Sequence, residues 1–272
     1  MTGEERAFLN ALILRNKPKK LLEIGVSAGS SSIVMLNAIK DSPDAILHSI
    51  DYLDHWYRSS DKKVGYFVDN YMELKKQWRL YYGGLSLKFM DEIVRGEGVD
   101  FCLIDTAHVN PGEILDFLMI LPYLKEDATV VFHDVNLHTW NYPYMQWSIT
   151  NNLLISAITG QKYLQGNFSP EGIYENIQGS PCFPNIAAVK INENTKKHVF
   201  EVFNLLTIKW GYLPSGNEQM EIISHFGKHY DAYYINYLRD IFAYQKKCHD
   251  KEMMLFWYRL KNFLKEFIGK KK

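Results

Sequence analysis

Short apolar runs alternate with amphipathic stretches between Lys19 and Ile191. This alternation is typical of a doubly wound parallel sheet, in which helices connect successive strands and pack on both faces. The apolar runs predict strands over residues 20–25, 45–51, 78–83, 99–105 and 128–134, and two further strands over 162–165 and 185–191. We therefore expect an α/β fold with a seven-stranded, mostly parallel sheet.

Two of the connecting segments carry helix signals. After Ser59, five apolar side chains recur with helical spacing, namely Val64, Phe67, Val68, Tyr71 and Met72. Asn110 stands at a capping position, Pro111 at the first helical position and Glu113 at the third, which predicts a helix that begins there and runs to Leu121.

The alternation stops beyond Asn192, and residues 192–272 have the pattern of helices. We expect a sheet-containing domain over 1–191 and a C-terminal helical extension over 192–272. Apolar side chains share one face of the last helix: Phe256, Leu260, Phe263, Leu264 and Phe267. The basic side chains there are Arg259, Lys261, Lys265 and Lys270 to Lys272. Such a face commonly packs in a core or a homo-oligomer, which we expect, and peripheral contact with an anionic membrane stays open.

The amino-acid composition limits the classes of partner and the cellular compartment that we expect. The chain has 272 residues, with 31 Lys plus Arg against 31 Asp plus Glu, so no overall field favours a nucleic acid. Its three cysteines form no CxxC pair, which disfavours a disulfide framework or a structural zinc site. The charged N-terminus is unlike a signal peptide, and no apolar run is long enough to span a bilayer. We expect a cytoplasmic protein.

Ligands bind at the carboxyl ends of the strands in sheets of this kind. The first predicted strand continues into "VSAGSSS", where Gly25 and Gly29 allow close approach to the backbone and helix amides can receive an anion. Ser27 and Ser30 stand where a dinucleotide fingerprint has glycine, and there is no GxxxxGK[ST] motif. Asp51 ends the second strand, where a carboxylate can accept hydrogen bonds from a ribose diol. These pieces fit an adenosine ligand without a pyrophosphate, although glycine and serine also make plain tight turns.

The stretches "LLEIGVSAGSSS" and "SIDYLD" resemble motifs I and II of class I S-adenosylmethionine-dependent methyltransferases, and the resemblance extends from Leu21 to Val135. It implies that residues 25–29 pass under the methionine moiety, that Glu23 supports this loop and that Asp51 binds the ribose. Residues 83–86 would border the adenine. The expected cofactor-binding residues are Glu23, Gly25, Ser27, Gly29, Ser31, Asp51, Gly83, Ser86 and Asp105.

Two further stretches, "LIDTAH" and "VVFHD", bring Asp105, His108, His133 and Asp134 to neighbouring strand ends. Carboxylates with an imidazole suit a divalent cation, which would offset the cost of burying these groups. The arrangement resembles metal-dependent O-methyltransferases of the macrocin-type sugar branch. The resemblance implies Asp105, His133 and Asp134 as ligands of Mg²⁺ or Mn²⁺ and His108 as the general base. His133 replaces an aspartate of that branch, and it is a second candidate catalytic residue.

We therefore expect an S-adenosylmethionine-dependent O-methyltransferase, assisted by a divalent cation, that modifies a hydroxyl of a sugar or related small molecule. The aromatic stretch 138–147 is expected to cover the acceptor or to pack on the helical extension. A metal-independent methyltransferase, a cephalosporin-hydroxylase-like enzyme and a non-catalytic adenosyl-ligand-binding assembly subunit stay open. In the plainest reading, Asp105 caps the next segment, His108 is a surface histidine, and His133 and Asp134 satisfy each other.

Overall fold

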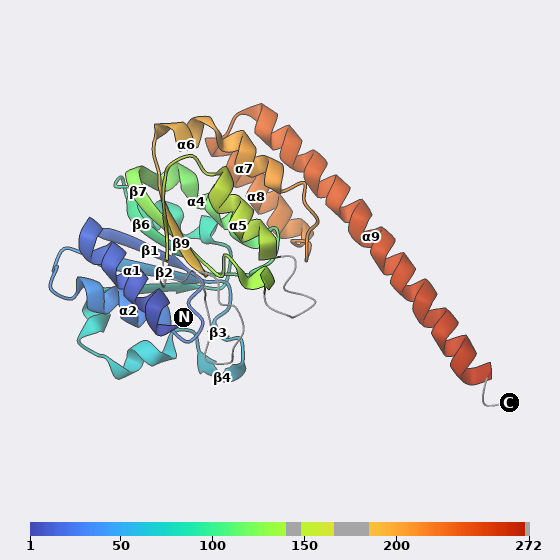
Figure 1. The fold of residues 1–272 in the computed structure, drawn as a ribbon, viewed down its shortest axis with the longest axis horizontal. Helices are drawn as coiled ribbons and strands as arrows, with labels where there is room; N and C mark the ends of the chain where they lie inside the picture. Colours follow the sequence, from blue (N-terminus) through green and yellow to red (C-terminus); the bar gives the residue numbers. More distant parts are fainter. Residues whose placement is uncertain (140–147, 166–184, 270–272) are drawn as a thin grey trace, which may run out of the picture.

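Helices cover both faces of a central sheet in the computed structural model (Figure 1). The backbone is described for residues 1–139, 148–165 and 185–269, and side chains for the same residues apart from 139 and 262–269. The predicted cover over 138–147 falls almost entirely outside the described residues.

The sheet has seven strands in the order β5-β2-β1-β6-β7-β9-β8. Strands β5, β2, β1, β6 and β7 run parallel, whereas β9 is antiparallel to both of its neighbours. The strands are β1 (Lys20–Ile24), β2 (Ile46–Asp51), β5 (Trp78–Tyr82), β6 (Val99–Ile104), β7 (Leu124–His133), β8 (Gln161–Leu164) and β9 (Ile186–Lys190). A separate hairpin consists of β3 (His55–Trp56) and β4 (Ser59–Lys63). The predicted doubly wound, mostly parallel sheet is confirmed.

The α-helices of the described chain are α1 (Gly3–Asn16), α2 (Ser30–Ile39), α3 (Met90–Val94), α4 (Gly112–Ile120), α5 (Ile149–Ala157), α6 (Glu193–Lys197), α7 (Val199–Leu205), α8 (Gly216–His229) and α9 (Ala232–Gly269). Short 3-10 turns are η1 (Tyr66–Asn70), η2 (Leu74–Gln77), η3 (Ser86–Lys88), η4 (Leu121–Tyr123) and η5 (Leu137–Thr139).

Neighbouring residues of one strand enter different cores because side chains alternate across a sheet. Leu21 of β1 packs in a cluster with Leu9 of α1 and Leu36 of α2. The next residue, Leu22, belongs to the cluster that contains Phe117 of α4. Burial of each such side chain contributes about 1.5–3 kcal/mol to folding. The sheet is therefore packed on both faces, which fixes the position of its carboxyl edge.

The prediction of an amphipathic helix through residues 64–72 is wrong. The chain forms the β3–β4 hairpin and then the turns η1 and η2. Val64 and Val68 are buried, but the other three predicted core residues are exposed: Phe67 (39%), Tyr71 (42%) and Met72 (66%). Gly65 adopts a left-handed conformation (φ 71°) directly before η1. Burying Val64 and Val68 requires only one short turn. Tertiary packing therefore outweighs the helical spacing of the five apolar residues.

The helix predicted from Asn110 is confirmed as α4, but its cap differs. Pro111 occupies the capping position, and the side-chain nitrogen of Asn110 instead donates to the carbonyl of Ile208 at 2.8 Å. The carboxylate of Glu113 accepts a hydrogen bond from the backbone nitrogen of His108 at 2.6 Å. Asn110 is used in a tertiary contact and Glu113 in a bond to the preceding loop, neither of which the helix signals report.

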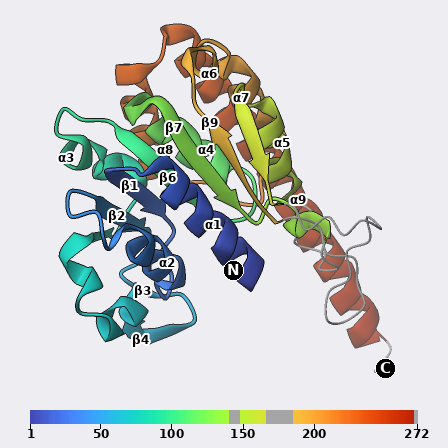
Figure 2. The same ribbon diagram turned by 60° about the vertical axis from the view of Figure 1, so that its left-hand side comes forward.

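The predicted C-terminal helices are present, and their first part packs on α4 (Figures 1 and 2). Phe203 of α7, Phe226 of α8 and Leu238 of α9 share one buried cluster with Phe117 of α4. The rings of Phe203 and Phe226 meet edge to face with centroids 5.7 Å apart. Helix α9 then extends far beyond the body (Figure 1). The division of the chain at residue 191 stays a prediction.

Candidate active site at the carboxyl edge of the sheet

The ends of β1, β6 and β7 lie side by side because these strands are parallel neighbours. Ile24 is in register with Ile104, and Ile104 with Phe132. The residues that follow the three strands therefore meet at one edge. The structure brings together Gly25, Asp105 and His133, as the sequence predicts.

The glycine loop touches the end of β6. Gly25 has φ 90°, and a Cβ added to it would lie 1.9 Å from the carbonyl oxygen of Asp105. Only glycine fits that position. At Gly29 (φ 93°), an added Cβ would lie 3.1 Å from Val68 and from Gly65. The absence of a side chain at Gly29 thus allows the turn η1 to pack against the glycine loop. We did not expect this backbone contact from the sequence.

Glu23 fastens this loop from below. Its side chain is fully buried and accepts hydrogen bonds from the hydroxyls of Ser31, Ser32 and Ser49 at 2.5, 2.6 and 2.6 Å. Burial raises the pKa of the Glu23 carboxyl to about 7, against the effect of the three hydroxyl donors. The predicted supporting role of Glu23 agrees with this geometry. The hydroxyl of Ser31, a predicted cofactor contact, is already directed at Glu23.

Asp51 orders the same loop from the neighbouring strand. Its Oδ2 accepts hydrogen bonds from the backbone nitrogens of Val26 (2.9 Å) and Ser27 (2.8 Å), and its Oδ1 from that of Leu53 (2.9 Å). A carboxylate has about four acceptor positions, so Asp51 keeps capacity for a further donor such as a ribose hydroxyl. Ser27 itself adopts a left-handed conformation at φ 53°.

Strand β5, which lies beside β2, is followed by open space and by a serine hydroxyl without a hydrogen-bond partner among the described residues. Gly83 has φ 88°, and a Cβ added to it would meet nothing within 4 Å. Ser86 is only 1% exposed, yet its hydroxyl has no hydrogen-bond partner among the described residues. A buried polar group without a partner is uncommon and indicates a missing one, such as a ligand or water. That these two residues border the adenine stays a prediction.

Asp105, His108 and Asp134 form a cluster whose ligand atoms all lie within 4.8 Å of one another. Nδ1 of His108 is 3.3 Å from Oδ2 of Asp134, and Nε2 is 3.8 Å from Oδ1 of Asp105. His108 and Asp134 both have positive φ, at 59° and 55°. Left-handed backbone at residues other than glycine is costly and concentrates at functional sites. The cluster is the one group of this kind found among the described residues.

His133 lies at the predicted strand end, but it is outside this cluster and pairs with three carboxylates. Its Nδ1 lies 3.1 Å from Oδ1 of Asp105 and 3.3 Å from Oδ1 of Asp134, and its Nε2 lies 3.2 Å from Oε2 of Glu5. Burial disfavours the charged ring, but the three carboxylates outweigh it and raise the pKa of His133 to about 12. His108, and not the predicted His133, shares the cluster with Asp105 and Asp134.

The acidic surroundings also shift the other two groups. Burial opposes the ionised form of Asp105, yet His133 and His108 lower its pKa to about 2. For His108, burial is outweighed by Glu113, Asp105 and Asp134, which raise its pKa to about 9. Asp105 therefore favours the ionised form, and the rings of His108 and His133 favour the protonated form.

Sequence reasoning missed Glu5, Asn185 and the tertiary role of Glu113. Glu5 belongs to a capping box with Thr2, which explains it locally and conceals its contact with His133. Asn185 donates to Oδ1 of Asp134 at 2.5 Å. Glu113 is 1% exposed, and its Oε2 has no partner among the described residues. A glutamate inside an apolar helix was the only available signal.

The C-terminal region reaches the cofactor side of this edge. The carboxylate of Glu218 at the start of α8 raises the pKa of Tyr52, which follows Asp51. Lys88 of η3 lies 3.3 Å from the carboxylate of Glu221. The first turns of α8 therefore border the space next to Asp51 and Ser86.

Residues 22–135 match the family described as methyltransferase domain. Solved structures with similar folds include cofactor-bound Rv0187 from MTB, with a TM-score of 0.52 and 14% identity over 71% of this chain and 82% of that one. A candidate caffeoyl-CoA O-methyltransferase from Staphylococcus aureus gives a TM-score of 0.50 and 18% identity, covering 71% of this chain and 84% of its own.

The O-methyltransferase TomG from Streptomyces achromogenes, involved in tomaymycin synthesis and solved in complex with SAM, gives a TM-score of 0.49 and 18% identity. That alignment covers 71% of this chain and 81% of TomG. No curated protein sequence matches the chain. The structures with TM-scores of 0.50 and 0.52 share the Rossmann-like methyltransferase fold with this chain.

Proposed function

We propose that this chain, whose residues 22–135 match a methyltransferase-domain family, is an S-adenosylmethionine-dependent enzyme that methylates a hydroxyl of a sugar or related small molecule with the help of a divalent cation. One observation carries the proposal. The glycine loop expected to hold the cofactor is in backbone contact with Asp105, and Asp105 belongs to the Asp105–His108–Asp134 cluster. A methyl donor and an acceptor held at these two places would be neighbours.

The residues on the cofactor side fit S-adenosylmethionine, which supplies an electrophilic methyl group on a sulfonium when bound. Asp51 has acceptor capacity left for the ribose hydroxyls. The Ser86 hydroxyl has no protein partner and is available to the adenine edge. The open space at Gly83 leaves room beside it. Glu23 holds the loop in place through three serine hydroxyls and makes no direct contact with the ligand in this proposal.

Asp105, His108 and Asp134 would hold the cation. A bound divalent cation acidifies a coordinated hydroxyl and orients it for attack. His133 holds Asp105 and Asp134 in position, because its ring lies within 3.3 Å of both carboxylates, and it lowers the pKa of Asp105. We expect Mn²⁺ to serve better than Mg²⁺, since one of the three donors is an imidazole and Mg²⁺ favours oxygen.

A route without a metal has support of its own. His133 already supplies a fixed positive charge to two of the carboxylates, and His108 lies against Asp105, Asp134 and Glu113. In this second candidate, His108 removes the proton of the acceptor hydroxyl directly. The His108 ring must first lose its own proton. Because its pKa is about 9, activity should rise with pH.

The saccharide acceptor rests on the resemblance of "LIDTAH" and "VVFHD" to the macrocin-type branch. To test it, the protein is incubated with methyl-labelled cofactor and a panel of saccharides, phenols and other small alcohols, and products are identified by mass spectrometry. Label in a saccharide supports the proposal. Label only in phenols would reject the sugar acceptor, and cofactor binding without turnover on any acceptor would favour an adenosyl-ligand-binding subunit.

A further inference from the structure

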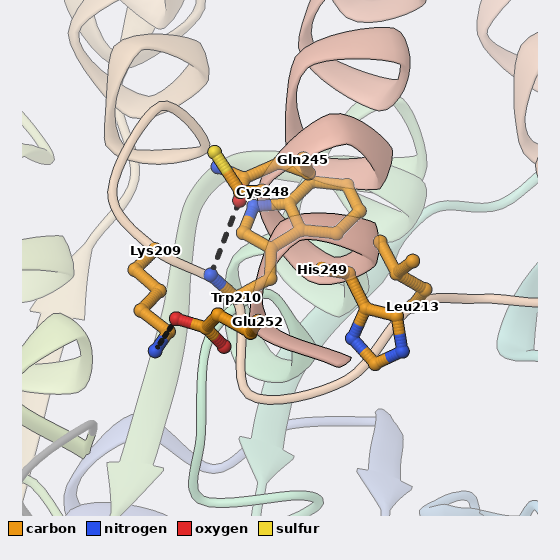
Figure 3. Close-up of a pocket in the computed structure, with 7 residues that line it drawn as sticks. All are labelled: Lys209, Trp210, Leu213, Gln245, Cys248, His249 and Glu252. Carbon is orange, nitrogen blue, oxygen red and sulfur yellow. Dashed lines mark hydrogen bonds and ion pairs between the residues drawn. The ribbon is translucent and has the colours of Figure 1, made fainter. Parts of the chain in front are cut away.

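Helix α9 is firmly attached to the body over its first half. Gln245 is 2% exposed, and its side-chain nitrogen donates to the carbonyls of Leu206, Thr207 and Ile208 at 3.1, 3.2 and 2.9 Å. The backbone nitrogen of Trp210 donates to the side-chain oxygen of Gln245 at 3.3 Å (Figure 3). These bonds satisfy the carbonyl groups that follow α7. They also fix the orientation of α9 relative to the body.

The last anchor of α9 among the described side chains is the ion pair between Glu252 and Lys209 (Figure 3). Beyond this pair, the helix runs on to Gly269 outside the body (Figure 1). We call residues Met253–Lys261, whose side chains are described, the tail segment.

Six consecutive apolar residues open the tail segment, and all are exposed: Met253 (41%), Met254 (67%), Leu255 (48%), Phe256 (55%), Trp257 (59%) and Tyr258 (66%). An α-helix has 3.6 residues per turn, so six consecutive residues cover its whole circumference. A contiguous apolar surface of this kind marks an interaction site. A single partner helix would cover one side and leave the others in water.

Positive charge surrounds this apolar band. The described basic residues on this part of α9 are Lys246, Lys247, Lys251, Arg259 and Lys261, and the acidic ones are Asp250 and Glu252. Glu252 is already paired with Lys209. The whole chain balances 31 basic against 31 acidic residues, so this excess of positive charge is local. A complementary partner is anionic.

We propose that the tail segment docks on an anionic lipid surface. Trp257 and Tyr258 are the side chains that favour the boundary between headgroups and acyl chains, and flanking cations add attraction to acidic headgroups. Lipid can surround the apolar band on several sides, which a single helix of a second copy cannot. No helix within the described residues is long and apolar enough to cross a membrane, so the helix would lie at the interface.

The test mixes full-length protein with phosphatidylcholine vesicles that either contain or lack phosphatidylserine, and measures the bound fraction by sedimentation. We expect binding to the anionic vesicles that decreases as salt rises. Replacing three cations, as in Lys251→Gln/Arg259→Gln/Lys261→Gln, should lower the partition coefficient on the order of 100-fold. The pair Phe256→Ser/Trp257→Ser should also abolish binding. Lys40→Gln/Lys76→Gln/Lys228→Gln removes three exposed charges elsewhere and should bind normally.

Equal binding to both vesicle types, no binding at all, or binding that survives both sets of tail substitutions would overturn the proposal. Sedimentation equilibrium without lipid tests the alternative, in which the tail segment binds a second copy of this chain. A dimer that Phe256→Ser/Trp257→Ser converts to a monomer, in a protein that ignores vesicles, would assign the tail segment to a second copy of this chain.

Discussion

Glu5 and His133 are 128 positions apart, yet Oε2 of Glu5 lies 3.2 Å from Nε2 of His133. The contact ties the start of α1 to the carboxyl edge of the sheet. His133 has a folded-state pKa of about 12 against an ordinary value of 6.5. The stabilisation from its proton is therefore complete below pH 6.5. It is lost as the pH rises towards the folded-state value.

Replacing Glu5 by glutamine should lower the free energy of unfolding at pH 7 by about 2 kcal/mol. The buried imidazolium then loses one of three carboxylates but keeps Asp105 and Asp134, so the loss is smaller than for an isolated pair. Urea unfolding measures it. Thr2→Ala removes only the cap of α1 and should cost about 1 kcal/mol. Glu4→Gln, an exposed neighbour on the same turn, should be neutral. If Glu5→Gln costs no more than Thr2→Ala, the charge contact with His133 contributes nothing.

Asp51→Ala should weaken S-adenosylmethionine binding by about 1.5–3 kcal/mol, the scale of hydrogen bonds to a charged group. The variant loses the expected ribose contact and also the bonds that order the amides of Val26 and Ser27. Calorimetric titration with the cofactor gives the affinity. Asp54→Ala, three positions further along, is the matched control. An unchanged dissociation constant for Asp51→Ala would remove this residue from the cofactor site.

Gly83 and Gly96 offer a matched pair for locating the cofactor. Both have left-handed backbone, with φ 88° and 89°, and a Cβ added to either meets nothing within 4 Å. Alanine at either position should therefore cost a similar amount, about 1–2 kcal/mol of stability. Only Gly83→Ala should reduce cofactor affinity, by tenfold or more, because its methyl group would enter the adenosine space. Equal affinities for the two variants would place the adenosine elsewhere.

Chelation decides between the two proposed routes. With a cation in the Asp105–His108–Asp134 cluster, methyl transfer should stop with a chelator and return with added metal, more with Mn²⁺ than with Mg²⁺. Asp134→Ala should remove activity and metal binding while cofactor affinity stays within about tenfold, or ~1.4 kcal/mol. Metal binding is measured separately by titration calorimetry.

Without a metal, activity should ignore the chelator and require His108. Because burial of this ring is outweighed by its three carboxylate neighbours, kcat should rise with pH up to about 9 and then level. His108→Gln should remove that pH dependence together with the activity. A chelator-resistant rate that is flat between pH 6 and 10 contradicts both routes.

Much of the fold could be read from residue order. The apolar runs specify the strands because a parallel strand buried on both faces is continuously hydrophobic. Parallel neighbours place their carboxyl ends together, so Asp105 and Asp134 were expected side by side before any coordinates. Gly25 was identified as a place where backbone approaches closely, although the approaching group is the carbonyl of Asp105.

Tertiary structure alone decided which histidine shares a cluster with Asp105 and Asp134. His108 follows β6 and His133 ends β7, and nothing in their order separates the two. The difference comes from Glu5, which reaches His133 from a helix that is distant in sequence, and from the left-handed backbone that turns His108 towards Asp134. The same limit explains residues 64–72, where the hairpin and Gly65 override a helical pattern. Sequence periodicity reports which side chains prefer burial, whereas the partner of a buried charge depends on which distant segments fill the remaining space.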